Sequence, residues 1–232
     1  MTAKLTTIGF DADDTLWQNE QFFRMSQERF AQLLADFAEP DHLEDRLFAC
    51  ETRNLGRYGF GIKGFVLSMI ETAIEVTDGR VPASVIQDLI AVGQEMLTHP
   101  IELLDHARET IEALNGKYKI ILITKGDLLD QERKLAQSGL GDLFDGVEIL
   151  SHKTMSAYSD IFDRHGAGAK HAMMVGNSLR SDVIPVLNAG GWGVFVPHDM
   201  TGRLEWDEEP QSNDRYRRIA GLDDLEPLLL NI

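Results

Sequence analysis

The feature that most constrains this chain is a set of short apolar runs in which apolar and polar residues do not alternate. The runs cover residues 5–10, 120–123, 147–150, 172–175 and 194–196. Such runs are typical of strands that are buried on both faces, as in a parallel sheet. Helical patterns that end near glycine lie between the later runs, at residues 101–115, 127–138, 154–165 and 179–189. This alternation predicts a doubly wound α/β sheet of the Rossmann-like kind.

One long segment, residues 17–100, interrupts the alternation because it contains no convincing strand. Helical patterns occupy most of it, at residues 20–38, 42–55, 64–77 and 83–98. We therefore expect a core domain of residues 1–16 and 101–232, with an inserted all-helical cap domain of residues 17–100 that folds over the sheet. The acidic stretch Glu205–Asp214 contains proline and is expected to form a surface loop.

The composition limits the classes of partner. The chain has 232 residues, with 38 acidic and 22 basic side chains and a formal net charge of −16. This balance argues against nucleic acid and acidic membranes as partners, since both need clustered Lys and Arg. Cys50 is the single cysteine, so no intramolecular disulfide can form, which fits a reducing compartment. No signal peptide is visible, and no apolar run is long enough to span a bilayer. We expect a cytoplasmic protein.

Polar residues follow each predicted strand, and the first of these ends carries a cluster of carboxylates. They are Asp11, Asp13 and Asp14 after the first run, then Thr124, Lys153, Asn177 and Asp182 after later runs. The carboxyl ends of parallel strands share one edge of the sheet, so these residues are expected to converge. Clustered carboxylates favour a bound cation.

Two kinds of metal site can be set aside from the spacing. An EF-hand loop that started at Asp11 would need Gly at its sixth position and Glu at its twelfth, but these hold Leu16 and Phe22. Zinc is disfavoured because the histidines are scattered and form no ligand-spaced pair with Cys or Glu. Oxygen ligands with room for phosphate and water suit Mg²⁺.

Four motifs in order give the chain a family resemblance. Asp11, Asp13 and Thr15 form the pattern DxDxT, the second run ends at Thr124, and Lys153 is a lone lysine after the third run. The segment 176–182 matches GDSxxxD except for one position. Over essentially its whole length, the sequence resembles the haloacid dehalogenase-like (HAD) hydrolases, and specifically their phosphatases with a helical cap after the first strand.

The resemblance implies roles for individual residues. Asp11 is expected to be the nucleophile that forms an aspartyl phosphate, and Asp13 to be the general acid and base. The phosphate-binding side chains are expected to be Thr124, Lys125 and Lys153, of which Thr124 and Lys153 count as catalytic. The Mg²⁺ ligands are expected to be Asp11, Asp13 through its main-chain carbonyl, Asn177 and Asp182. Asn177 departs from the family pattern, where Asp is more frequent, and thereby removes one negative charge. Asp14 is expected to be a solvent-facing turn residue.

The function that this implies is a Mg²⁺-dependent phosphatase acting on a small phosphorylated metabolite, as a monomer or homodimer without a nucleic-acid or membrane partner. Two alternatives stay open within the family, a phosphomutase and a haloacid dehalogenase. A third is a HAD-like binding protein with weak catalysis, which Asn177 keeps in play. Asp13 favours phosphate esters, because relatives that cleave carbon–halogen bonds generally lack an acid at this position. The sequence does not indicate the substrate.

Overall fold

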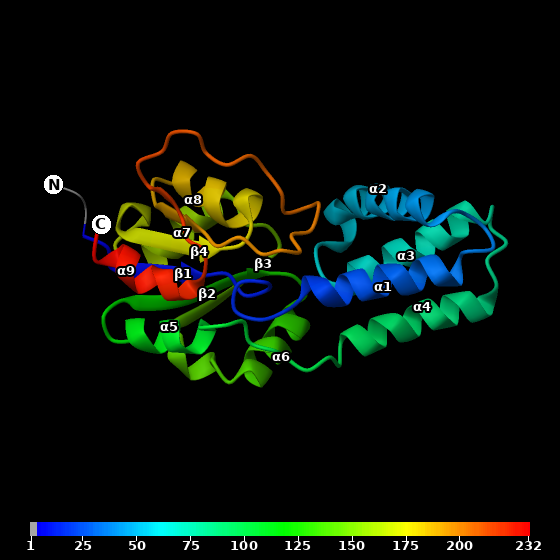
Figure 1. Cartoon of the computed structure of the whole chain (residues 1–232), viewed down its shortest axis with the longest axis horizontal. Helices are drawn as coiled ribbons and strands as arrows, with labels where there is room; N and C mark the ends of the chain where they lie inside the picture. Colours follow the sequence, from blue (N-terminus) through cyan, green and yellow to red (C-terminus); the bar gives the residue numbers. More distant parts are fainter. Residues whose placement is uncertain (1–3) are drawn as a thin grey trace. The chain divides into compact units, whose positions relative to one another are not determined.

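A parallel sheet forms the centre of the larger part of the molecule. The computed structural model describes residues 4–232, and the sheet within them has the strand order β3-β2-β1-β4-β5-β6 (Figure 1). The strands are β1 (Thr7–Phe10), β2 (Lys119–Lys125), β3 (Gly146–Leu150), β4 (Ala172–Gly176), β5 (Trp192–Phe195) and β6 (Tyr216–Arg218). Every neighbouring pair is parallel. The order runs outwards from β1 in both directions, which confirms the doubly wound α/β prediction.

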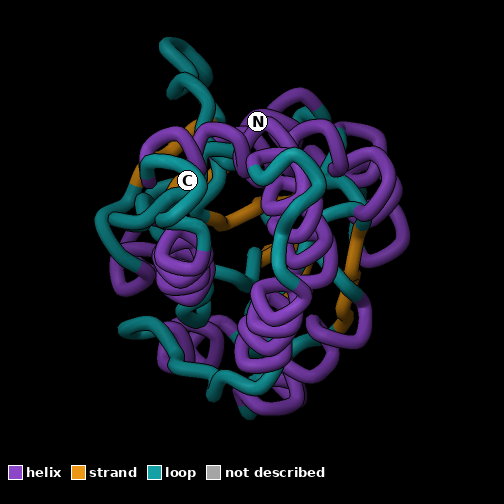
Figure 2. The backbone as a smooth tube through the Cα atoms, turned by 90° about the vertical axis from the view of Figure 1, so that its right-hand side faces the viewer, coloured by secondary structure: helices purple, strands orange, loops and turns teal. Residues whose placement is uncertain are grey.

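Helices cover both faces of the sheet because successive strand residues point to opposite sides. On one face, Ile8, Leu122 and Val175 pack in the same buried cluster as residues of α5 (Ala107–Leu114) and α9 (Leu225–Leu229). On the other face, the strand residues pack against α7 (Met155–His165) and α8 (Ile184–Asn188). These strand residues are Ile121, Ile123 and Met174. Figure 1 shows α5 and α7 on opposite sides of the strands, and Figure 2 colours the strands orange and the helices purple.

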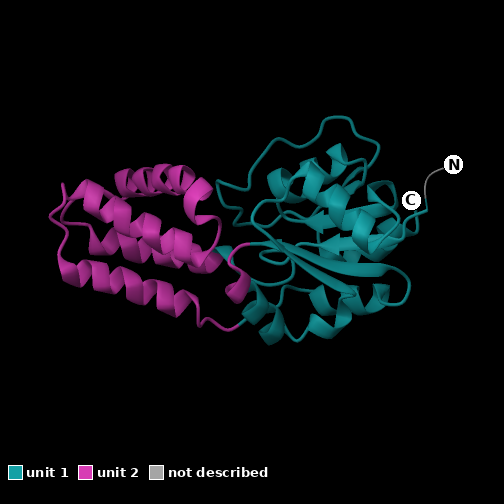
Figure 3. Cartoon of the chain, turned by 180° about the vertical axis from the view of Figure 1, so that it is seen from behind, with its two compact units in different colours: residues 1–20, 101–125, 131–232 teal, residues 21–100, 126–130 magenta. Residues whose placement is uncertain are grey.

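The inserted segment is helical. It forms α1 (Glu20–Leu33), α2 (Pro40–Tyr58), α3 (Ile62–Val76) and α4 (Ala83–Met96) around its own apolar core. Residues 21–100 together with 126–130 form one compact unit, and the rest of the described chain forms the other (Figure 3). The domain boundaries after residues 16 and 100 stay a prediction.

The prediction of a helix over residues 101–115 was wrong at its beginning. Helix α5 starts only at Ala107, after His106 in a left-handed conformation with φ of 63°. The preceding residues instead run alongside residues 16–18, since the Leu104 N–H donates to the Leu16 carbonyl and the Gln18 N–H to the Glu102 carbonyl, both at 2.9 Å. Backbone groups paired in this way are not available to a helix.

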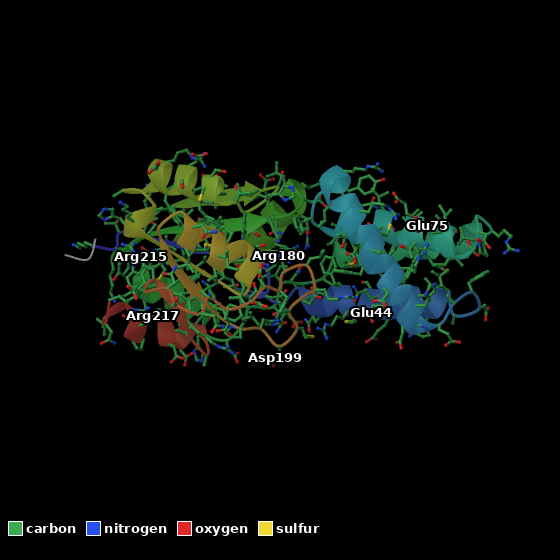
Figure 4. The ribbon with its side chains drawn as sticks, turned by 90° about the horizontal axis from the view of Figure 1, so that it is seen from above. Glu44, Glu75, Arg180, Asp199, Arg215 and Arg217 are labelled. Carbon is green, nitrogen blue, oxygen red and sulfur yellow. The ribbon has the colours of Figure 1, made fainter. Side chains whose placement is uncertain are left out.

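The C-terminal third also departs from the predicted pattern. The segment 179–189 begins with a π-helical turn, Leu179–Val183, before α8. Strand β6 and helix α9 were not predicted at all. The guanidinium groups of Arg215 and Arg217, labelled in Figure 4, lie 5.6 and 5.0 Å from the ring centre of Trp192 and help to hold β6 on the sheet edge.

Within the described residues, no helix is long and apolar enough to cross a membrane.

Candidate active site

Asp11 lies at the carboxyl end of β1 and is buried. Its N–H donates to the Val175 carbonyl of β4 at 2.9 Å, which fixes the backbone between two central strands. One carboxylate oxygen forms an ion pair with Lys153, and the other accepts a hydrogen bond from the Thr15 hydroxyl at 3.2 Å. Burial and the nearby charge of Asp182 raise the pKa of Asp11 to about 7, against the opposing effect of Lys153.

Lys153 lies between two carboxylates. Besides Asp11, its Nζ contacts Asp182 Oδ1 at 2.7 Å, and the other oxygen of Asp182 accepts the Ser178 N–H at 3.0 Å. Burial disfavours the ammonium form, but the two carboxylates outweigh it and raise the pKa of Lys153 above its usual value. The site therefore holds a permanent cation directly beside Asp11.

The turn after β1 is closed by Asp14, which was expected to face solvent. That expectation was wrong, because Asp14 is 7% exposed and adopts a left-handed conformation with φ of 60°. Its carboxylate accepts hydrogen bonds from the N–H groups of Asn19 at 2.8 Å and Glu20 at 3.0 Å, and thereby caps the start of α1. Burial raises the pKa of Asp14 to about 6.

Asp13 has surroundings that contrast with those of Asp11. Its Oδ1 accepts the Trp17 indole N–H at 2.7 Å, and its Oδ2 accepts the Gln131 amide at 2.8 Å. The Lys134 Nζ reaches both oxygens, at 2.9 and 3.1 Å. Burial alone would raise the pKa of Asp13, but Lys134 and these hydrogen bonds outweigh it and hold the pKa below its usual value. Asp13 is therefore held as a carboxylate.

The side chain of Asn177 and the main-chain carbonyl of Asp13 lie beside the Asp11 carboxylate. Asn177 follows β4, and its Oδ1 accepts the Thr15 hydroxyl at 3.2 Å. In the opposite amide orientation its nitrogen donates to Asp11 Oδ2 at 3.2 Å and to the Asp13 main-chain carbonyl at 3.3 Å. This opposite orientation satisfies the hydrogen bonds of the amide, whereas the first one turns Asn177 Oδ1 towards Asp11 Oδ2 and the Asp13 carbonyl oxygen and would suit a bound cation. These oxygens form a donor set that fits Mg²⁺.

Asp182, the remaining predicted metal ligand, is linked to Asp11 by the Lys153 ammonium that both carboxylates contact. One Asp182 oxygen contacts the Lys153 ammonium at 2.7 Å and the other accepts the Ser178 N–H at 3.0 Å, and its role as a metal ligand stays a prediction. Within residues 4–232, no group of three His, Cys, Asp or Glu side chains is arranged to hold a metal ion.

The two predicted phosphate-binding residues of β2 differ in their surroundings. Thr124 is buried at the end of the strand, 2% exposed. The Lys125 ammonium forms an ion pair with Glu205 and donates to the Ser181 hydroxyl at 2.7 Å. The Ser178 hydroxyl donates to Glu205 Oε2 at 2.7 Å. Lys125 is thus engaged by a carboxylate from the loop after β5.

Sequence reasoning missed Lys134, Gln131 and Glu205. Gln131 and Lys134 are three residues apart on α6 (Leu128–Ser138), a spacing that puts both on one helix face. Lys134 is only 6% exposed, whereas lysines are seldom buried without a partner. Two long polar side chains at this spacing, directly after a strand that ends in the site, were the available signal. Glu205 offered none, since it lies in an irregular loop.

Comparison with known proteins places these residues in a family. The family model of the haloacid dehalogenase-like hydrolases matches residues 5–190. A haloacid dehalogenase-like family hydrolase from Xanthomonas campestris is 39% identical, with a TM-score of 0.87 over 98% of this chain and 91% of that one. The glyceraldehyde 3-phosphate phosphatase of Methanothermobacter thermautotrophicus is 25% identical over 85% of this chain and 88% of its own. A HAD-hydrolase of Bacillus subtilis, YfnB, described as bound to magnesium, shares the fold at 20% identity, with a TM-score of 0.65 over 99% of this chain and all of that one.

Proposed function

Since the chain belongs to the haloacid dehalogenase-like hydrolases, we propose that it hydrolyses phosphate monoesters of a small metabolite, with Asp11 as the nucleophile. The observation that carries the proposal is the pair of carboxylates at the end of β1. Asp11 lies against a buried lysine, while Asp13, two residues further on, is held apart by other donors. Phosphoryl transfer through a carboxylate needs both a nucleophile and a separate proton carrier.

In the proposed first step, a carboxylate oxygen of Asp11 attacks phosphorus. The new Asp11–phosphorus bond forms as the ester P–O bond breaks, and the leaving oxygen takes a proton from Asp13. In the second step, water attacks phosphorus, Asp13 accepts the proton, and Asp11 leaves with the bonding electrons. As an acid, Asp13 has to carry a proton when the ester bond breaks, and the negative charge of a bound phosphate favours protonation of a neighbouring carboxylate.

Two further side chains are proposed to act on the phosphoryl group. Lys153 supplies positive charge to the oxygens of the group in transfer, which is where charge stabilisation matters most in phosphoryl transfer. Thr124 donates a hydrogen bond to one of them. Lys125 is proposed to contact the phosphate as well, although its ammonium group is also paired with Glu205.

A magnesium ion fits the oxygen donors of this site, and we propose that it is the cofactor. The ligands would be Asp11, the Asp13 carbonyl, Asn177 and, directly or through water, Asp182. When bound, Mg²⁺ supplies positive charge that offsets the negative charge of the phosphate and of Asp11. The protein is acidic overall, so a local cation is also needed to attract an anionic substrate.

A small phosphorylated metabolite is the proposed substrate class. The phosphatase relative is named for glyceraldehyde 3-phosphate, which supports a compact phosphate ester at the level of class. The acidic charge and the lone cysteine support action in the cytoplasm. A monomer or a homodimer is the proposed assembly. A panel of phosphorylated metabolites, with and without chelator, identifies the substrate and tests the need for Mg²⁺.

Replacement of Asp13 tests the mechanism. Asp13→Asn keeps the shape but cannot carry a proton, so release of phosphate from p-nitrophenyl phosphate is expected to fall about 10²- to 10⁴-fold. The control is Asp142→Asn, the same change at an exposed position away from the site. Unchanged turnover in Asp13→Asn would contradict the proposed role of Asp13 as the general acid and base. Halide release from a haloacid, conversion to an isomeric phosphate, or tight binding without hydrolysis would point to the dehalogenase, mutase or binding protein instead.

A further inference from the structure

The Asp13 carboxylate is held by three donors that lie outside the motifs of the family. The Trp17 indole contacts Oδ1, the Gln131 amide contacts Oδ2, and the Lys134 ammonium contacts both oxygens. These donors come from two elements, the turn after β1 and helix α6. All four atom pairs lie within 3.1 Å, and each oxygen of Asp13 has two of these contacts.

Lys134 is buried for this contact. Its side chain is 7% exposed and that of Asp13 is 22% exposed. Besides Asp13, the Lys134 Nζ contacts Asn19 Oδ1 at 2.8 Å. Removing an ammonium group from water is costly, and the cost is offset only by a close carboxylate and further hydrogen bonds. A solvent-exposed lysine on α6 would avoid this desolvation cost. The burial of Lys134 is therefore explained by its contact with the Asp13 carboxylate.

The contact also opposes repulsion between carboxylates. Asp11 and Asp14 are both within two residues of Asp13, and like charges at this spacing push one another towards solvent. Gln131 adds a geometric link, because its amide also donates to the Lys125 carbonyl at 3.3 Å, at the end of the strand that carries Thr124. The direction of the Asp13 side chain is thereby tied to the end of β2.

We propose that Lys134, assisted by Gln131, is a positioning residue that fixes the Asp13 carboxylate for proton transfer. This inference rests on the proposed phosphatase function and deepens it. Lys134 contacts neither the reacting phosphoryl group nor the metal ion and affects the reaction through its contact with Asp13. Removing it lets the carboxylate turn away from Asp11 and Asp14, so proton transfer to the leaving oxygen is lost while phosphorus chemistry at Asp11 is kept.

Two phosphate esters whose leaving groups differ in their need for protonation distinguish a positioning role of Lys134 from a purely structural one. Phenyl phosphate has a poor leaving group that needs an acid, whereas dinitrophenyl phosphate has one that leaves without it. The quantity to compare is kcat/KM, because it covers only the steps up to and including departure of the phenol. For Lys134→Met, kcat/KM for phenyl phosphate is expected to fall about 10²-fold, and for dinitrophenyl phosphate less than about threefold. Lys134→Arg should recover part of the loss.

The controls separate the possible failures. Lys117→Met makes the same change in an exposed ion pair with Glu226 and should alter neither ester. An equal loss on both esters, or a gain on phenyl phosphate, would overturn the positioning role. If Lys134→Met does not fold, Gln131→Leu removes a second donor and must show the same selectivity for phenyl phosphate. Wild-type protein inactive on both esters would refute the phosphatase proposal itself.

Discussion

Two aspartates of one short motif have opposite electrostatic surroundings. Asp11 is buried near Asp182, and its pKa is raised to about 7, whereas the pKa of Asp13 is lowered once Lys134 and its hydrogen bonds outweigh burial. The difference arises from their neighbours: Asp11 points to the lysine that it shares with another carboxylate, while Asp13 has an ammonium group of its own. Such a division of environments is what allows two carboxylates to carry out two tasks.

At the residue scale, Asn177 is the neutral ligand of the proposed metal site. Asn177→Asp restores a carboxylate, so the Mg²⁺ concentration for half-maximal activity is expected to fall about tenfold, a difference of about 1.4 kcal/mol. With chelator present, the same variant should be less stable than wild type, because another negative charge then faces Asp11. Asn231→Asp, at the exposed C-terminus, is the control. An unchanged magnesium requirement would contradict the proposal that Asn177 is a ligand of the metal ion.

The sequence could predict which residues end the central strands, and therefore Asp11, Thr124 and Asn177, since strand ends of a parallel sheet share one edge. Lys153 also reaches the site as predicted. The sequence could not predict the contact between Lys134 and Asp13. A contact between a helix residue and a turn depends on how α6 packs and on the extended length of the lysine. The burial of Asp14 was missed for a related reason: hydrogen bonds to the start of α1 appear only once the chain has turned.

At the scale of elements, the loop between β5 and β6 is fixed by one of its carboxylates. The stretch Glu205–Asp214 forms a loop without helix or strand, as predicted, but Glu205 is directed onto Lys125 and the hydroxyls of Ser178 and Ser181. Burial would raise the pKa of Glu205, but Lys125 and the two hydroxyls outweigh it, so the pKa lies below the usual 4.5.

The lowered pKa gives a pH dependence with a defined sign. Folded protein binds fewer protons at Glu205 than unfolded protein, so this carboxylate stabilises the fold above about pH 4.5, and the contribution is lost as the pH falls through the folded pKa. Glu205→Gln lacks this contribution. The difference in unfolding free energy between wild type and Glu205→Gln, measured with urea, is expected to be largest at neutral pH and to shrink below about pH 4.5. A difference that stays constant or grows in acid would contradict the ion pair.

The boundaries of elements were less predictable than their existence. The apolar pattern over residues 101–115 is compatible with one helix, yet pairing with residues 16–18 keeps its first six residues out of α5. Strand β6 has three residues, too few for a pattern, and its place depends on Trp192 and two arginines that meet only in the fold. In both cases tertiary contacts override local sequence preference.

At the scale of the whole molecule, the architecture and the family support each other. The family model spans residues 5–190, including the helical segment, and the Xanthomonas campestris hydrolase follows nearly the whole chain. A net charge of −16 repels anions at long range. In the proposed mechanism, Lys153 and a metal ion held near Asp11 would supply the local attraction for a phosphorylated substrate.

The central claim is that Asp11 carries the phosphoryl group during turnover. The direct test mixes the protein with dinitrophenyl phosphate and Mg²⁺, quenches in acid within the first turnovers, and reduces the sample with borohydride, which converts an acyl phosphate to an alcohol. Mass spectrometry of the peptide that contains Asp11 is expected to find this residue converted to homoserine, and unmodified when substrate is omitted. Turnover without modification at Asp11, or with phosphate on another residue, would contradict the account.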